Sequence, residues 1–194
     1  MRPSDLTTIG VAVLVASAAD ARASVSVTVT FDDLVQRASA AAVVAPVDQR
    51  SVWEDGRIVT YAHLRVERLV AGRLPSEIWV RAFGGAVGKI GQLVEGEATF
   101  ASGTESLVFL RPHADGASGG TFGVVEGAQG QFPVVNRGGT SPRLGASQGI
   151  GGLLPPPKGA SRLARDVLID HSVDEAAREI TAAWSRFHGL REAR

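Results

Sequence analysis

Six side chains in two neighbouring strand patterns have the types that hold a ligand. They are Tyr61, His63 and Arg65 in the first pattern, and Trp79, Arg81 and Phe83 in the second. Side chains of a strand alternate between its two faces, so each set of three projects from one face. If the two strands pair, the six lie side by side. Aromatic rings stack on flat or apolar ligand groups and arginines supply charge, so this face is a predicted ligand-binding site.

The C-terminal region offers a different use for the same face. Residues 172–189 have a helical pattern with Val173, Ala176, Ala177, Ile180, Trp184 and Phe187 on one side. Such an apolar stripe has to be buried against something, and the Tyr61 and Trp79 face could be its platform. The sequence favours this second use.

Other arrangements that could do chemistry are sparse. The histidines at 63, 113, 171 and 188 lack the spacing of a zinc motif, and no serine stands in a G-x-S-x-G elbow. We therefore predict no catalytic residue, no metal site and no cofactor. A hydrolase, or a hydrolase accessory protein, with a site near the Gly84–Gly103 loop is kept as an alternative.

Composition restricts the partners. The 194 residues contain 20 Lys and Arg against 20 Asp and Glu, so no general attraction to nucleic acid or to an anionic membrane is expected. Cysteine is absent, which excludes a disulfide framework, a thiolate metal site and a lipoprotein anchor. We expect a protein or glycan partner and consider nucleic acid unlikely.

The first 23 residues have the features of an export signal. Arg2 precedes an apolar run from Ile9 to Ala19, and Ala21-Arg22-Ala23 has the small-x-small form of a cleavage site. The run is too short to span a bilayer, and no later stretch has the length and purity of a transmembrane helix. The sequence predicts a protein that is secreted or periplasmic, without a membrane span after cleavage.

The mature chain divides into three predicted parts. Residues 24–136 contain a short helix capped by Thr30 and then a series of strand patterns, residues 137–160 are a Gly/Pro-rich linker, and residues 161–194 are helical. Turn signals such as Asp55-Gly56 separate short strands that are apolar on one face. This order predicts a mainly β protein built on a small antiparallel OB-like barrel of five or six strands, with a C-terminal amphipathic helix.

The strand region carries a resemblance. Residues 60–72, 78–80 and 103–110 resemble the netrin-like module of tissue inhibitors of metalloproteases. The Gly84-Gly85-Ala86-Val87-Gly88 loop is similar to that of uncharacterised exported bacterial domains, and the likeness covers Ala42 to Val135. It implies protease inhibition as a further alternative. The netrin-like inhibitors chelate the protease metal through an N-terminal cysteine, which this chain lacks, so inhibition would have to use loops.

These observations favour one function class over two others. We expect an exported, non-enzymatic interaction or ligand-binding domain. A hydrolase and a netrin-like protease inhibitor remain the alternatives.

Overall fold

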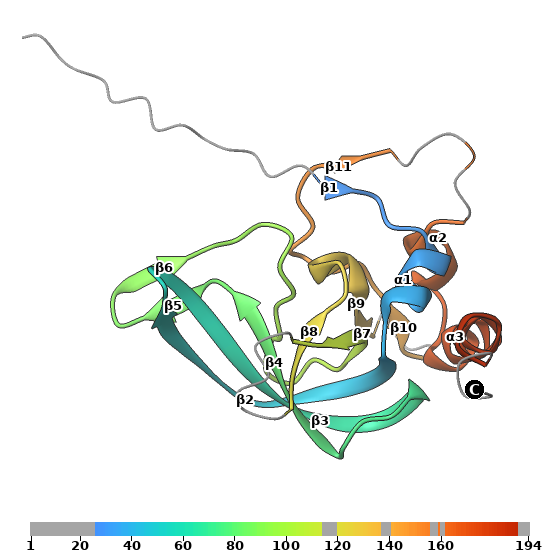
Figure 1. Ribbon diagram of the computed structural model, residues 1–194, viewed down its shortest axis with the longest axis horizontal. Coiled ribbons are helices and arrows are strands. Elements are labelled where there is room, and N and C mark those ends of the chain that lie inside the picture. The colour runs from blue at the N-terminus through green and yellow to red at the C-terminus, as the bar shows by residue number, and fades with distance from the viewer. Residues whose placement is uncertain (1–25, 114–119, 137–140, 156–158, 160–161, 190–194) are drawn as a thin grey trace, which may run out of the picture.

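The computed structural model describes residues 26–113, 120–136, 141–155, 159 and 162–189 (Figure 1). The predicted signal segment, residues 1–23, lies outside the described residues. In the described part the chain is mainly β, as predicted, with helices gathered at one side. None of the described helices is long and apolar enough to cross a membrane.

The elements follow one another in a β-rich order. The longer strands are β2 (Ala40–Glu54), β3 (Arg57–Gly72), β4 (Glu77–Phe83), β7 (Ser106–Pro112), β8 (Thr121–Val124) and β9 (Gln131–Val135). The short strands are β1 (Ser26–Val27), β5 (Gly85–Val87), β6 (Ile90–Gln92), β10 (Arg143–Leu144) and β11 (Leu153–Leu154). The helices are α1 (Phe31–Arg37), the 3₁₀ turn η2 (Gly127–Gly130), α2 (Ala164–Leu168) and α3 (Val173–His188).

One sheet of seven strands organises the molecule. Its order is β10-β9-β7-β2-β3-β4-β8, and β8 also pairs with β7, so the pairings lead from β7 through β2, β3, β4 and β8 back to β7. All of these pairs are antiparallel except β4 with β8, which is parallel. The prediction of five or six strands was too low, because β10 lies in the segment expected to be a linker.

The β2–β3 hairpin is the longest feature of this sheet. Asp55 and Gly56 form its turn with φ of 48° and 75°, as the Asp-Gly signal predicts. The pairing has three irregularities, one of them between Pro46 and Asp48. Proline cannot donate a backbone hydrogen bond to the neighbouring strand, so an irregularity at Pro46 is expected. These irregularities let the two long strands bend around the interior.

The bent sheet has a hydrophobic core on each side. The inner core is enclosed by the returning strands and includes Val44, Leu64, Val80 and Val108. The second core lies between the sheet and the helices and includes Phe109, Leu144, Leu168 and Ile180. Neighbouring residues of β7 therefore contribute to different cores, which explains why this strand is apolar on both faces.

The short first helix, α1, forms as predicted. Thr30 caps it by accepting a hydrogen bond from the backbone N–H of Asp33 at 3.1 Å. Phe31, Leu34 and Val35 are buried in the second core. The helix is therefore held by packing as well as by its cap.

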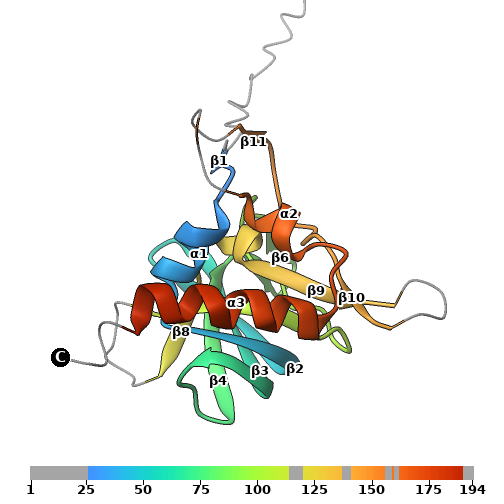
Figure 2. The ribbon, with the colours of Figure 1, turned by 90° about the vertical axis from the view of Figure 1, so that its right-hand side faces the viewer.

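The C-terminal helix α3 begins with the predicted capping box of Ser172 and Glu175. It does not cover the Tyr61 and Trp79 face, so the use that the sequence favoured is wrong. Its buried residue Ile180 joins the second core, and partly buried Trp184 packs against the same core. Figure 2 shows α3 lying beside α1. The reason is the length of β3, whose last residues Val70 and Ala71 extend the apolar platform beside α1.

The predicted Gly/Pro-rich linker contributes to the fold in its described part. Leu144 of β10 is fully buried, and the backbone N–H of Gly145 donates to the carbonyl of Pro133 at 2.7 Å. Leu153 and Leu154 of β11 pair in parallel with β1. Glycine and proline shorten strands but do not prevent two-residue pairings, and a single leucine supplies the burial.

We expect Leu144→Ala to lower the free energy of unfolding by about 2–5 kcal/mol, because it leaves a cavity in the second core. Leu154→Ala is the matched control, since Leu154 lies in the same segment and is 53% exposed. Urea unfolding followed by circular dichroism measures both. Equal and small effects would show that the segment is a linker after all.

Candidate functional site

The two strands that carry the candidate ligand-binding residues pair with each other, which is the condition that the sequence left open. In the β3–β4 register Tyr61 lies opposite Arg81, His63 opposite Trp79 and Val59 opposite Phe83. The neighbouring β3 residues Ala62 and Leu64 are buried in the inner core, so the alternation directs Tyr61 and His63 outwards. We call the outward surface of Arg50, Glu54, Tyr61, His63, Trp79 and Arg81 the outer face.

A polar triad anchors one half of the outer face. The Tyr61 hydroxyl donates to Glu54 Oε1 at 2.6 Å, while Arg81 donates to Glu54 Oε2 through Nη2 at 3.0 Å and Nε at 3.3 Å. Only 14% of the Arg81 side chain is exposed. Two donors on one carboxylate hold all three side chains in position.

Hydrogen bonding sets the protonation of the triad. The hydroxyl of Tyr61 and the guanidinium of Arg81 lower the pKa of Glu54 below its ordinary value. The same carboxylate raises the pKa of Tyr61. Glu54 is therefore an anion and Tyr61 a neutral donor at neutral pH, which suits recognition of a ligand more than proton transfer.

The other half of the outer face is a stacked pair of rings. The His63 imidazole and the Trp79 indole have centroids 4.6 Å apart and planes only 12° from parallel. His63 Nε2 lies 3.0 Å from Glu77 Oε2, and its Nδ1 lies 3.8 Å from Asp48 Oδ2. The two carboxylates flank opposite edges of the ring, so they orient it and do not converge on one metal position.

Arg50 connects the two halves. Its guanidinium carbon lies 5.7 Å from the ring centroid of Tyr61 and 5.4 Å from that of Trp79. Within the described part of the chain this guanidinium has no carboxylate partner. Sequence reasoning missed both Arg50 and Glu54. The Asp55-Gly56 turn could have identified Arg50, because it fixes a hairpin register in which Arg50 lies opposite Tyr61.

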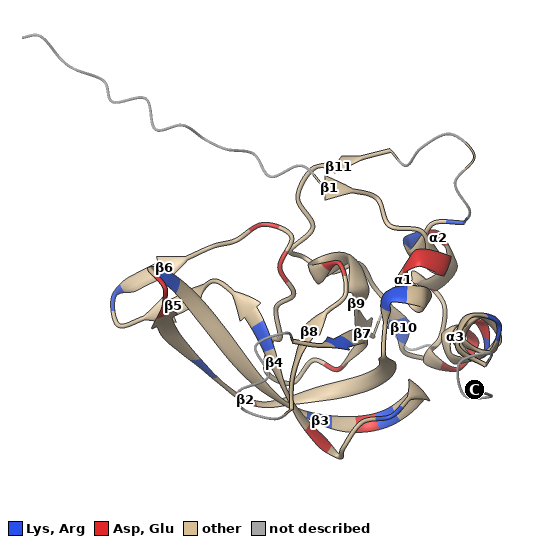
Figure 3. Ribbon diagram, in the orientation of Figure 1, with Lys and Arg blue, Asp and Glu red and all other residues tan. Residues whose placement is uncertain are grey.

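Except for His63, the side chains of the outer face line an open groove of about 560 Å³ that also includes His113. His113 Nε2 lies 3.4 Å from Arg81 Nη1. Figure 3 shows the charged positions on β2, β3 and β4 that surround this surface. The groove thus combines aromatic rings with groups of both charges.

Two predicted site residues lie at the margins. Arg65 pairs with Glu67 on its own strand, away from the aromatic rings. The ring of Phe83 lies under the guanidinium groups of Arg81 and Arg57, at 4.8 and 5.7 Å. The Phe83 backbone N–H donates to Glu97, whose pKa is raised by burial. The structure thus brings three of the six predicted residues, Tyr61, Trp79 and Arg81, into the groove, while His63 lies beside it, stacked on Trp79.

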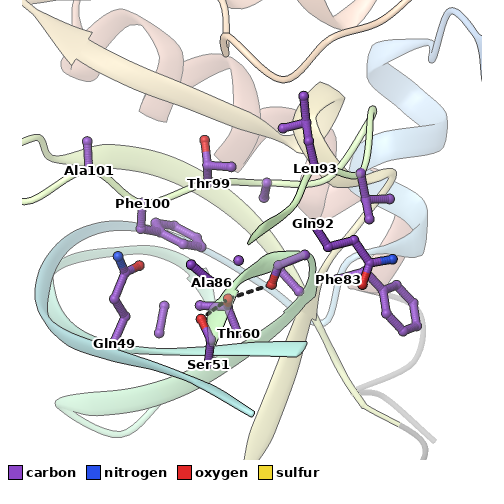
Figure 4. Close-up of a pocket in the computed structure, with 16 residues that line it drawn as sticks. Gln49, Ser51, Thr60, Phe83, Ala86, Gln92, Leu93, Thr99, Phe100 and Ala101 are labelled. Atoms are coloured by element: carbon purple, nitrogen blue, oxygen red, sulfur yellow. Dashed lines mark hydrogen bonds between the residues drawn. The ribbon is translucent and has the colours of Figure 1, made fainter. Parts of the chain in front are cut away.

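A second cavity, of about 490 Å³, lies on the other side of β4 (Figure 4). The β5–β6 hairpin and the chain after it cover this cavity against β2 and β3. Within it the Ser51 and Thr60 hydroxyl oxygens lie 2.8 Å apart, and Thr60 donates to the carbonyl of Gly84 at 2.6 Å. Phe83 turns its ring away from this pair. We call this space the hairpin cavity.

The remaining histidines serve the fold. His188 Nε2 lies 3.1 Å from the carbonyl oxygen of Val35, and its ring stacks on Trp184 with centroids 3.9 Å apart. His171 Nδ1 lies 3.2 Å from the carbonyl oxygen of Ile169. Among the described residues, no three His, Asp or Glu side chains gather in a way that could hold a metal ion.

We expect Tyr61→Phe to raise the pKa of Glu54, because the carboxylate loses one of its two donors while the ring stays in place. A group with a lowered folded-state pKa stabilises the fold above its unfolded pKa and loses that contribution as the pH falls. Unfolding of the variant should therefore depend less on pH on the acid side. Carboxyl NMR titration measures the shift, and an unchanged Glu54 pKa would contradict the triad.

Comparisons with known proteins identify no relative of this chain. No family model, no curated protein and no solved structure matches the chain. The resemblance to the netrin-like module therefore has no support beyond the quoted residues. Function has to be argued from the side chains themselves.

Proposed function

We propose that this chain is an exported, non-enzymatic binding domain and that its outer face binds a glycan. The observation that carries the proposal is the groove in which Glu54, Tyr61 and Arg81 hold one another beside Trp79. Side chains fixed before binding lose little conformational freedom when a ligand arrives, which favours affinity for a small polar ligand. The export signal predicted at residues 1–23 would bring the domain to extracellular or periplasmic glycans.

The character of the groove favours a glycan over a protein partner. Stable protein interfaces bury about 800 Å² on each partner around an apolar centre. None of the residues lining this groove belongs to the exposed large hydrophobic side chains of the described chain. A volume of about 560 Å³ is in the range of small-molecule sites. Aromatic rings beside fixed donors and acceptors suit a sugar, which has an apolar ring face and a rim of hydroxyls.

Arg50 favours an acidic sugar. Glu54 neutralises Arg81, whereas Arg50 contacts only aromatic rings among its described neighbours. A carboxylate on the ligand would give Arg50 the charged partner that the described chain does not supply. The Trp79 ring already stacks on His63 and lies near Arg50, so a sugar packed against the remaining accessible part of this ring would have its carboxylate within reach of Arg50. We therefore propose uronate-containing oligosaccharides as the ligand class.

The hydrolase alternative receives less support. His63 and His113 do lie near carboxylates, so histidine placement alone does not dismiss it. The lowered pKa of Glu54, however, makes this carboxylate a poor proton donor or base near neutral pH. In the Gly84–Gly103 region, the described side chains that line the hairpin cavity are all uncharged. Glu97 is in this region and burial raises its pKa, but it is not among the residues that line the cavity.

The pairings also support the OB-like barrel that we propose as the fold class. The connected series from β7 through β2, β3, β4 and β8 to β7 encloses the inner core. In OB-type barrels, oligosaccharides and oligonucleotides bind on an outer strand face and its neighbouring loops. The outer face has this kind of position. The balanced charge of the chain favours oligosaccharides over oligonucleotides.

A titration with oligogalacturonate and with a neutral galactose oligomer of equal length tests the ligand class. We expect the uronate oligomer to shift the Trp79 indole NMR signal and to leave the Trp53 and Trp184 signals in place. Trp79→Ala should remove binding, because the stacking surface is lost. Arg50→Gln should weaken uronate binding about tenfold, since a charged hydrogen bond contributes about 1.5–3 kcal/mol.

Two variants serve as controls for this titration. Trp53→Ala removes an exposed tryptophan at the end of β2, and Arg178→Gln removes an exposed arginine on α3. Neither should change the affinity. If neither sugar moves the Trp79 signal at millimolar concentration in a panel extended to other uronate and neutral oligomers, the glycan proposal fails.

A further inference from the structure

The hairpin cavity has a different chemistry from the outer face and stands apart from the proposed glycan site. Ala82 of β4 points into it, while its neighbours Arg81 and Phe83 point outwards. Its floor includes Ala62, Ala98 and Phe100 of the inner core. The cavity is thus an extension of the apolar interior that reaches the surface, at the opposite end of the molecule from the helices (Figure 1).

The charge of the lining side chains restricts which ligands the cavity can bind. No Asp, Glu, His, Lys or Arg is among the described residues that line the cavity. A charged ligand would lose its hydration without gaining a counter-charge there. Its occupant therefore has to be uncharged.

The polar groups that line the cavity favour a ligand that is mainly apolar. The Ser51 and Thr60 hydroxyls bond to each other, Thr60 donates to the Gly84 carbonyl, and Gln92 Oε1 accepts from the Ile58 backbone N–H at 2.7 Å. These groups are satisfied without a ligand, so they do not require a polar one. The Gln49 side chain points into the cavity and its amide makes no hydrogen bond within the described part of the chain, so it can serve a polar group of the ligand (Figure 4).

A close approach of the β5 backbone to β2 and β3 fixes the hairpin that forms one wall of the cavity. Gly85 has φ of +122°, and a Cβ there would lie 2.2 Å from Thr60 Oγ1 and 2.5 Å from Ser51 Oγ. Only glycine lets β5 approach the two hydroxyls so closely. The hairpin is therefore seated directly on β2 and β3, and the space behind it is a built feature of the fold.

Exposed hydrophobic side chains gather at the same end of the molecule. Leu93, which lines the cavity, is 90% exposed, and Ile90 of β6 and Trp53 of β2 are 55% and 50% exposed. Contiguous exposed apolar surface is typical of sites where an apolar partner or ligand binds. Leu93 lies at the rim of the cavity, and its side chain points away from the Ser51 and Thr60 hydroxyls (Figure 4).

We propose that the hairpin cavity binds a small, uncharged and mainly apolar molecule with one or two hydrogen-bonding groups. Its volume of about 490 Å³ is within the range of small-molecule pockets. The apolar body would contact Ala82 and Phe100, and its polar group would reach Gln49. This function is independent of glycan binding at the outer face.

The neutral fluorescent dye N-phenyl-1-naphthylamine is a suitable probe, with the anionic dye anilinonaphthalene sulfonate for comparison. We expect the neutral dye to bind the wild-type chain more tightly than the anionic dye. Ala82→Phe should fill the cavity and raise the dissociation constant of the neutral dye by about tenfold or more. Leu93→Asp places a charge at the rim, where Leu93 is almost fully exposed, and should weaken the neutral dye without unfolding the chain.

Two controls separate this proposal from other outcomes. Ala182→Phe adds the same ring at an exposed position of α3 and should leave dye binding unchanged, as should Trp79→Ala on the outer face. If Ala82→Phe folds, as judged by its circular dichroism, and still binds the neutral dye with wild-type affinity, the dye sits on the exposed apolar rim and the cavity proposal is overturned. Absence of neutral dye binding to the wild-type chain overturns it as well, whatever the result at the outer face.

Discussion

The antiparallel pairing of β2 with β3 is the interaction on which the rest of the structure depends. The first five residues of β2, from Ala40 to Val44, also pair with β7, so this part of the strand is hydrogen-bonded on both edges. Three successive alanines there are fully buried. Small side chains let layers pack close on both faces of the strand, and the two cores meet along it. Without this pairing, the strands that form the two cores and the two candidate sites would come apart.

Alternation along the paired strands divides the chemistry of the molecule. On β4, Trp79 and Arg81 belong to the outer face, while Val80 and Ala82 belong to the interior and to the hairpin cavity. On β2, Arg50 faces the groove and Ser51 the cavity. A one-residue slip of register would exchange the two sets and bury an arginine without a partner. The same register that forms the core therefore keeps the charged site and the neutral site apart.

Strand patterns, turn chemistry and caps could be predicted because each depends on a few neighbouring residues. Asp55-Gly56, Thr30 and the Ser172 and Glu175 box are local signals, and each element formed as predicted. What could not be predicted depends on long-range pairing. The burial of Leu144 results from pairing with β9, and the position of α3 results from a β3 strand longer than its alternating pattern. For the same reason Tyr61 and Trp79 could be proposed from their strands, whereas Glu54 and Arg50 needed the hairpin register to be recognised as their partners.

The net charge of the whole chain does not describe the distribution of charge on the outer face. Glu54 neutralises Arg81 and lowers the energy of placing a largely buried guanidinium on the sheet, but it leaves Arg50 held only by aromatic rings. Cation–π contacts orient a guanidinium without neutralising it, so its field is available to a ligand. A net charge of zero is therefore compatible with the preference for anions that we propose for this surface. The preference would arise because the nearby carboxylates already have other partners. Glu54 binds Arg81 and Tyr61, and Glu77 lies beside His63, so neither neutralises Arg50.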